Sequence, residues 1–291
     1  TLFDGISAAD TARRELGCTL PVPSDQRLPH GRQPRRPLRS GGPRKGQPTA
    51  PMSVSPRPAG TQRVSIVIPC LNEAAIVRQR LVALQPLRRA GHEILLVDGG
   101  SSDGTEDLAR PLVDRVLSAA RGRARQMNLG AREARWEVLW FLHLDAEPPA
   151  GGADAVLGAI RNGSDWGRFE VRLSGQAHLL RVVERMMSVR SRVTGIATGD
   201  QGVFVRRTLF ESVGGFAEIP LMEDVDLSAR LKRAARPAVV PLRIVASSRR
   251  WEQNGILRTV VQMWVLRAGF WLGVDPGRLA RLYYPEQIDR L

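Results

Sequence analysis

The sequence predicts an α/β protein in which a mainly parallel β-sheet is flanked by helices. Two observations support this prediction. From Arg63 onward, short apolar runs rich in β-branched residues alternate with segments whose apolar residues recur at helical spacing. Several of the short runs are apolar throughout, as strands buried on both faces are. The chain has 291 residues, of which 43% are hydrophobic and 25% charged, so it can build a substantial globular core.

The first strand and helix are read from Val64 onward. "VSIVIP" is a short strand, and "NEAAIVRQRLVALQPLRRAG" follows as a helix with Asn72 as its expected N-cap and Gly91 as its end. "EILLVD" is a second strand that ends on Asp98. The turn "GGSSDGT" then leads into the helix "TEDLAR".

The next strands repeat this arrangement. "VDRVLS" and "RGRARQMNLGAREA" form a third strand and its helix, and "EVLWFLHLD" is a fourth strand that ends on Asp145. Ligands of parallel sheets bind outside the carboxyl ends of the strands. We therefore expect Asp98 and Asp145 to face one crevice, although each residue alone is more often a turn or cap residue.

A second group of acids follows in the C-terminal half. "GVFVRR" is expected as a strand, "RTLFESV" as a short helix, and "EDVDLSARLKRA" as a helix that begins with Glu223, Asp224 and Asp226. These acids suit the positive end of the helix dipole, so they can be simple helix-start residues. A carboxylate held rigidly at such a junction can also serve as a general base.

The N-terminal segment differs from the rest in composition. Residues 1–62 hold ten Lys and Arg against four Asp and Glu, and residues 21–62 are dense in Pro, Gly and Arg. We expect residues 1–62 to be disordered and residues 63–291 to form the folded domain, with functional sequence beginning near Met52. The two cysteines, Cys18 and Cys70, lie far apart and favour a reducing compartment, so a cytoplasmic location is expected.

Five ordered motifs resemble family 2 glycosyltransferases of the GT-A fold. They are "VSIVIPCLNEA", "ILLVDGGSSDGT", "GRARQMNLGA", "FLHLDAEPP" and "EDVDLSARL", spread over roughly residues 63–235. "FLHLDAEPP", "GDQGVFVRR" and "SSRRWEQNGILRT" further resemble a bacterial subgroup of arsenosugar-biosynthesis glycosyltransferases. A more distant similarity is to enzymes that glucosylate a carotenoid carboxylate at the membrane.

The resemblance implies an inverting transfer from a nucleotide-sugar donor, with Mn²⁺ or Mg²⁺, to a small-molecule or lipid acceptor. It divides the domain into a nucleotide-binding half, 63–148, and an acceptor half with C-terminal helices, 149–291. Asp98 would bind the base, with uracil expected, and Asp145 would bind the metal. Asp224 would be the catalytic base. The remaining implied or expected contacts are Pro69, Leu71, Glu73 and Arg123 for the donor, and Glu223, Arg249, Arg250 and Trp251 for phosphate or acceptor.

Two positions depart from the family pattern. His143 stands where the first acid of the Asp-x-Asp motif is usual, which would weaken metal binding or shift it toward Glu147. Gly99 replaces the second acid of a strand-end Asp pair, while Asp98 remains. A diphosphate leaving group gains negative charge, and one or two carboxylates with substrate oxygens suit Mn²⁺ or Mg²⁺.

Alternative functions remain open at this point. The run 256–274 is interrupted by Arg258 and Arg267 and is too polar to span a bilayer. It can pack on the core and wall the acceptor pocket, which we favour. It can also lie at the inner face of a membrane, where a carotenoid or lipid carboxylate would be glucosylated. The net charge of +14 leaves a basic nucleic-acid-binding α/β protein as the alternative of another class. Nucleotidyl transfer is disfavoured because "PCLNEA" replaces a Gly-rich loop.

Overall fold

The computed structural model describes residues 63–284, which lie within one compact unit, Ser55–Leu291. The segment expected to be disordered, 1–62, falls outside the described residues. The division of the domain into halves at residue 148 stays a prediction.

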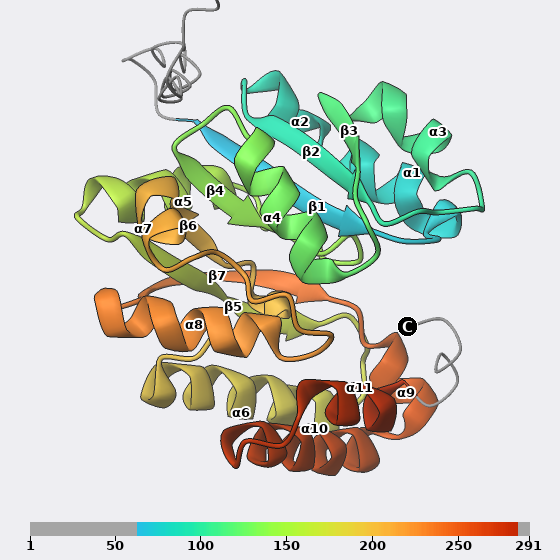
Figure 1. Cartoon of the computed structure of the whole chain (residues 1–291), viewed down its shortest axis with the longest axis vertical. Helices are drawn as coiled ribbons and strands as arrows, with labels where there is room; N and C mark the ends of the chain where they lie inside the picture. The colour runs from blue at the N-terminus through green and yellow to red at the C-terminus, as the bar shows by residue number, and fades with distance from the viewer. Residues whose placement is uncertain (1–62, 285–291) are drawn as a thin grey trace, which may run out of the picture. The chain divides into compact units, whose positions relative to one another are not determined.

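The described residues form a seven-stranded sheet in the order β3-β2-β1-β4-β6-β5-β7 (Figure 1). Strands β1 to β4 are mutually parallel, β6 is antiparallel to both of its neighbours, and β7 is parallel to β5. The predicted α/β class with a mostly parallel sheet is confirmed. The strands are β1 Val64–Cys70, β2 Glu93–Asp98, β3 Arg115–Ser118, β4 Val138–Phe141, β5 Trp166–Leu173, β6 Phe204–Arg206 and β7 Ala238–Ala246.

Helices cover both faces of this sheet and continue into a helical C-terminus, as predicted. Short 3-10 turns span Arg110–Leu112 and Gly199–Gln201. The α-helices are α1 Ala74–Ala83, α2 Gln85–Arg89, α3 Thr105–Ala109, α4 Arg123–Glu133, α5 Gly152–Arg161, α6 His178–Thr194, α7 Arg207–Ser212, α8 Glu223–Ala234, α9 Arg249–Asn254, α10 Ile256–Trp271 and α11 Pro276–Tyr283.

The alternation of side chains along β1 explains the layers. Ile66 and Ile68 belong to the core shared with α1 and α5, whereas Val67 points to the core shared with α4, α7 and α8. Both faces are therefore buried, which accounts for the uninterrupted apolar strands. The approach of α4 is close: a Cβ on Gly130 would lie 2.3 Å from Cγ1 of Val67.

Local chemistry shortens two predicted elements. β4 ends at Phe141, because the chain turns between His143 and Asp145; Asp145 thus follows the strand by four residues instead of ending it. The first predicted helix is split into α1 and α2 at Leu84, with Pro86 at the start of α2.

The prediction that Asn72 is the N-cap of α1 is wrong. Asn72 has a left-handed φ of 54°, and its side chain accepts a hydrogen bond from the neighbouring loop. The first N–H of α1, that of Ala74, donates instead to Oδ2 of Asp103 at 2.9 Å.

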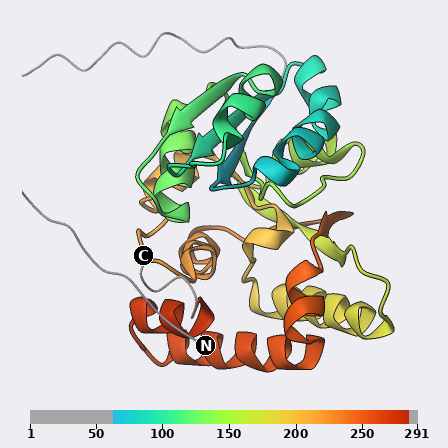
Figure 2. The ribbon, with the colours of Figure 1, turned by 90° about the vertical axis from the view of Figure 1, so that its right-hand side faces the viewer.

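The C-terminal helices form a layer beyond β5 and β7. Leu266 of α10 and Leu279 of α11 pack against Val225 of α8, and α6 packs under β5 through Leu180. Figures 1 and 2 show α6, α10 and α11 together at the end of the structure away from β2 and β3. Within residues 63–284, every helix is too short or too polar to cross a membrane.

Candidate functional site

Two loops at the carboxyl ends of β1 and β2 are joined by reciprocal hydrogen bonds. The N–H of Asn72 donates to Oγ of Ser101 at 2.8 Å, and the N–H of Ser102 donates to Oδ1 of Asn72 at 2.9 Å. The N–H of Glu73 donates to Oγ1 of Thr105 at 2.8 Å. These bonds fix the loop 71–73 that was predicted to hold the donor. Leu71 in this loop and Pro69 just before it are half-buried.

Asp98 is buried at the last position of β2 and orders the loop that follows. Its Oδ2 accepts hydrogen bonds from the N–H groups of Gly100 and Ser101, both at 2.8 Å, and its Oδ1 accepts one from the Ser101 hydroxyl. Burial, and next the Asp98 charge, raise the pKa of the Cys70 thiol, which keeps it neutral. Asp98 thus stabilises the turn after β2 through these hydrogen bonds, while its contact with a nucleotide base stays a prediction.

Glu73, after β1, and Asp145, after β4, are near enough for their charges to interact. Burial raises the pKa of Glu73, and the nearby charge of Asp145 raises it further, while Arg249 and Arg123 oppose the shift. Like charges this close disfavour double ionisation. The site therefore gathers negative charge that a bound cation would relieve.

His143 lies against the turn Gly199–Gln201. Its Nδ1 lies 3.7 Å from Oδ1 of Asp200, and a Cβ on Gly199 would lie 2.4 Å from the ring. Burial opposes ionisation of Asp200, but the interactions with His143 and the charges of Arg123 and Arg267 together outweigh burial and lower the pKa of this carboxyl. Glu147, the other expected metal-binding position, pairs with Arg80 and its backbone bridges to Val245.

Across the described part of the chain, no three His, Cys, Asp or Glu side chains are grouped as metal ligands. Divalent cations of the Mg²⁺ type commonly use one or two carboxylates together with water and phosphate oxygens. Asp145 beside Glu73 fits such an open arrangement. It does not fit a closed protein cage.

Arg123 opens α4 and connects the donor loops with α8. Its Nη1 lies 3.4 Å from Oε1 of the buried Glu223. Burial would lower the pKa of Arg123, but Glu223 and the other acids around it raise the pKa above its usual value. For Glu223, burial raises the pKa, and the charge of Arg123 opposes that rise. Arg123 is therefore the cation shared by the predicted donor and acceptor sides.

Asp224 follows Glu223 in the first turn of α8. Its Oδ2 accepts a hydrogen bond from the N–H of Gly199, and its Oδ1 accepts one from the N–H of Val225, both at 2.7 Å. A carboxylate has about four acceptor positions, so free lone pairs remain. Two backbone donors thus fix the orientation of a half-buried carboxylate that can still accept a proton.

The three remaining predicted residues lie in α9 and have different surroundings. Arg249 is exposed and close enough to Glu73 to lower its pKa. The guanidinium carbon of Arg250 lies 4.0 Å from the ring centre of Tyr283, a cation–π contact that holds α11. Trp251 packs against the apolar cluster between β5 and α6.

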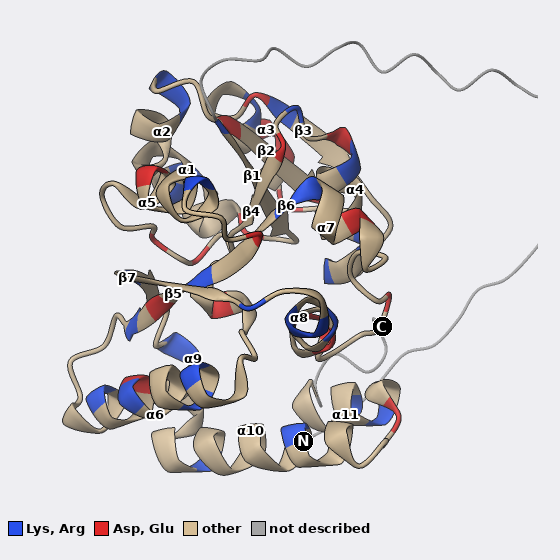
Figure 3. Ribbon diagram, turned by 90° about the vertical axis from the view of Figure 1, so that its left-hand side faces the viewer, with Lys and Arg blue, Asp and Glu red and all other residues tan. Residues whose placement is uncertain are grey.

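The structure brings the predicted acids together with residues that sequence reasoning missed. Gly199 and Asp200 are the first two residues of the quoted motif "GDQGVFVRR", yet their backbone and carboxyl roles show only in three dimensions. Arg190 and Arg267 were missed as a pair because they are far apart in sequence and come from α6 and α10. Basic positions recur on α6, α8 and α9 (Figure 3).

The chain is similar to known proteins in sequence and in fold. Residues 65–182 match the family described as Glycosyl transferase family 2. A curated relative, the probable glycosyltransferase YdaM of Bacillus subtilis (strain 168), is 26% identical over 66% of this chain and 51% of its own length. This chain thus spans about half of that relative.

Solved structures share the fold. The mannosyltransferase PcManGT from Pyrobaculum calidifontis, in complex with GDP-Man and Mn²⁺, has a TM-score of 0.52 at 23% identity, covering 67% of this chain and 59% of its own. S. aureus TarS 1-349 in complex with UDP has a TM-score of 0.53 at 18% identity, covering 64% and 60%. Residues 65–182 therefore match a family 2 glycosyltransferase domain, and the described residues have the mixed α/β architecture of GT-A structures.

Proposed function

We propose that this domain transfers a sugar, with inversion, from a nucleoside-diphosphate donor to an acceptor held between α8 and the C-terminal helices. The proposal rests chiefly on Asp224. Backbone N–H groups of Gly199 and Val225 fix its carboxylate, and Arg123 interacts electrostatically with both Asp224 and Glu73 of the donor loops. A positioned carboxylate beside a cation suits deprotonation of an acceptor and stabilisation of a departing phosphate.

The donor side is assigned to the joined loops of β1 and β2. Pro69, Leu71 and Glu73 would line the nucleotide pocket, and Asp98 would orient the base through the loop that it orders. Two structures with this fold contain GDP-Man and UDP respectively. They share a nucleoside diphosphate, and UDP is our first choice for this chain.

Asp145 would hold Mn²⁺ or Mg²⁺ beside Glu73, in an open site that donor oxygens complete. When bound, the ion would neutralise charge on the diphosphate. Arg123 would contact the phosphates from the start of α4, and Arg249 would approach them from α9. Asp224 would take the proton of the acceptor hydroxyl, or would orient an acceptor carboxylate.

The finer assignment is to an arsenosugar-type acceptor. It is supported by the motifs "FLHLDAEPP" and "SSRRWEQNGILRT" alone. We also propose that the protein acts in the cytoplasm and contacts the inner face of a membrane.

Calorimetric titration of the full chain with UDP, with and without Mn²⁺, tests the donor half. We expect Mn²⁺ to tighten UDP binding in the wild type and to have no effect in Asp145→Ala. Asp154→Ala, which removes an exposed carboxylate from α5, is the matched control. Equal Mn²⁺ dependence in Asp145→Ala and the control would refute the metal assignment.

A further inference from the structure

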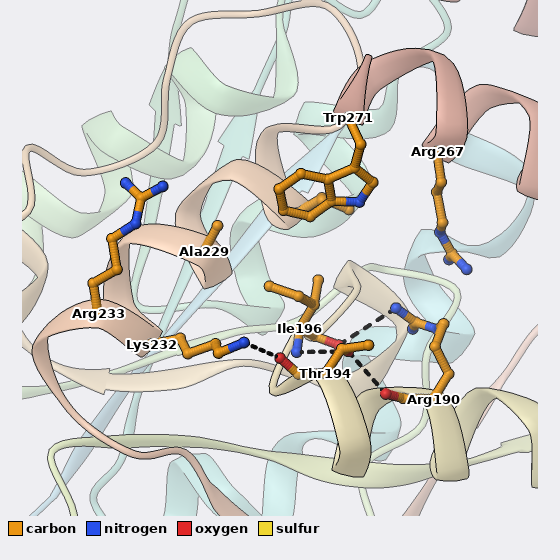
Figure 4. Close-up of a pocket in the computed structure, with 9 residues that line it drawn as sticks. Arg190, Thr194, Ile196, Ala229, Lys232, Arg233, Arg267 and Trp271 are labelled. Carbon is orange, nitrogen blue, oxygen red and sulfur yellow. Dashed lines mark hydrogen bonds between the residues drawn. The ribbon is translucent and has the colours of Figure 1, made fainter. Parts of the chain in front are cut away.

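A basic cavity of about 390 Å³ lies between α6, α8 and α10. Figure 4 shows most of its lining. The lining includes four cationic side chains and no acidic one among the described residues. The lining residues are Arg190, Thr194, Ile196, Val225, Ala229, Lys232, Arg233, Arg267 and Trp271.

Two of the four cations converge, and two do not. Figure 4 shows the guanidinium groups of Arg190 and Arg267 turned toward the same part of the cavity, whereas Arg233 points away. Lys232 is already engaged, because its Nζ donates to the carbonyl of Thr194 at 2.6 Å. The part of the cavity that would attract an anion therefore lies between α6 and α10.

Arg190 has unused hydrogen-bonding capacity in this position. Its Nη1 donates a long bond of 3.5 Å to the carbonyl of Ile196, while its buried Nε and Nη2 have no hydrogen-bond partner among the described residues. Burial lowers the pKa of Arg190 to about 10, with Arg267 adding to the shift, so the side chain is still charged at neutral pH. Burying N–H groups of a cation without acceptors is costly. An anion between the two guanidinium groups would remove that cost.

The cavity extends from the first turn of α8 toward its end. Val225, which lines the cavity, follows Asp224 directly, and Arg233 lies about 12 Å further along the helix at 1.5 Å per residue. Asp224 is also close enough to Arg190 and Arg267 to oppose the lowering of their pKa values. An acceptor anchored in the cavity could thus present a reacting group to Asp224.

We propose that the cavity between α6, α8 and α10 binds an anionic group of the acceptor, a phosphate or a carboxylate, through Arg190 and Arg267. Guanidinium groups bind both anions bidentately. This inference rests on the proposed glycosyl transfer and adds the chemical class of the acceptor. Trp271 at the cavity rim is 58% exposed and would cover the uncharged part of the ligand.

The helices α6 and α10 also carry exposed apolar side chains. An anion attached to a hydrocarbon chain is therefore tested separately from a free anion. On α6 these include Val182, Met186, Val189 and Val193, and on α10 they include Leu257, Val261, Trp264 and Val265. Both kinds of ligand would bind through their anionic group. Free and hydrocarbon-linked anions are separated by the choice of probes.

The experiment is calorimetric titration of the full chain with inorganic phosphate, with dodecyl phosphate below its micelle concentration, and with dodecyl maltoside as the uncharged amphiphile. We expect saturable binding of at least one phosphate probe and none of comparable affinity for dodecyl maltoside. Arg190→Met and Arg267→Met should each weaken that binding at least tenfold. Arg185→Met, which removes an exposed arginine from α6, should change it less than twofold. Phosphate as the better probe would indicate a small acceptor, and dodecyl phosphate as the better probe an amphiphile.

Binding that is equal in Arg190→Met and wild type, or absent for both phosphate probes, would overturn the inference. UDP binding measured in the same samples separates this failure from failure of the proposed function. If UDP binds normally while no phosphate probe does, only the acceptor inference is lost. Thermal unfolding checks that Arg190→Met folds, and we expect this variant to be at least as stable as wild type, because it no longer buries unpartnered N–H groups.

Discussion

The backbone N–H of Gly199 donates a hydrogen bond of 2.7 Å to Oδ2 of Asp224, so the turn before β6 orients the first turn of α8. The same glycine supports His143, since a Cβ at position 199 would lie 2.4 Å from the imidazole ring. Gly199, which has no side chain, thus sets the distance between His143 and Asp224.

Gly199→Ala should lower turnover at least tenfold, because the added methyl must displace either the ring of His143 or the N–H that holds Asp224. Donor binding, measured by titration with UDP, should change little. In the double variant Gly199→Ala/His143→Ala the methyl has room, so part of the activity should return. A double variant no better than the single one would contradict this steric explanation.

Asp224→Asn should reduce kcat by about 10² to 10⁴-fold, the usual contribution of a positioned general base. The affinity for UDP should stay within twofold of wild type, because the donor loops are not altered. Asp226→Asn is the matched control in the same helical turn, where Asp226 pairs with Arg230 instead. Steady-state kinetics with the donor and the identified acceptor provide the measurement. Retention of most of the activity by Asp224→Asn would show that another group is the base.

Glu223→Gln should alter the pH dependence of stability. Burial raises the pKa of Glu223 in the folded state, so the folded state binds more protons than the unfolded one above the ordinary pKa of a glutamate. Stability contributed by the protonated form is present at low pH and is lost as pH rises through the raised pKa. The free energy of unfolding of Glu223→Gln, relative to wild type, should therefore increase as the pH rises above about 4, the ordinary pKa of a glutamate.

Chemical denaturation at several pH values measures this difference. Glu218→Gln is the control, because Glu218 also pairs with an arginine of α4, Arg125, but is exposed. Its difference from wild type should be small at every pH. A difference for Glu223→Gln that is constant with pH would be evidence against a raised pKa.

Gly130→Ala tests the packing of α4 on the sheet. The new Cβ would lie 2.3 Å from Cγ1 of Val67, so we expect a loss of about 1–3 kcal/mol in the free energy of unfolding. Gly158→Ala in α5 is the helical control, since its Cβ would meet only the end of Arg161 at 3.9 Å. The control should be neutral or stabilising by up to about 1 kcal/mol. Equal effects of the two substitutions would show that α4 can shift away from β1.

Much of the fold could be predicted because local pattern and final structure agree. The run "EILLVD" became β2 with the expected bounds, and "EDVDLSARLKRA" became α8, since apolar pattern favoured both elements and charge placement also favoured the helix. The antiparallel placement of β6 between β4 and β5 could not be predicted, because strand pairing depends on tertiary contacts. Residues 150–198 received no predicted element, although α5, β5 and α6 lie there.

The candidate site was predictable in part for the same reason. Asp145 and Asp224 stand out in sequence because acids follow apolar runs at both positions. The bonds of Asp224 to Gly199, and the pairing of Arg123 with Glu223 across 100 positions, depend on how distant segments pack. Neither has a sequence signal of its own.

The double use of α8 has a consequence for the divergence of related enzymes. One end of this helix carries Asp224, while its flank packs through Val225 against Leu266 and Leu279. Lineages could therefore exchange the last two helices, and with them the molecules they glycosylate, while inheriting the nucleotide-handling loops unchanged. Substitutions that distinguish relatives of different acceptor range should gather on α6, α10 and α11, and those that track the sugar nucleotide should gather on the loops after β1 and β2.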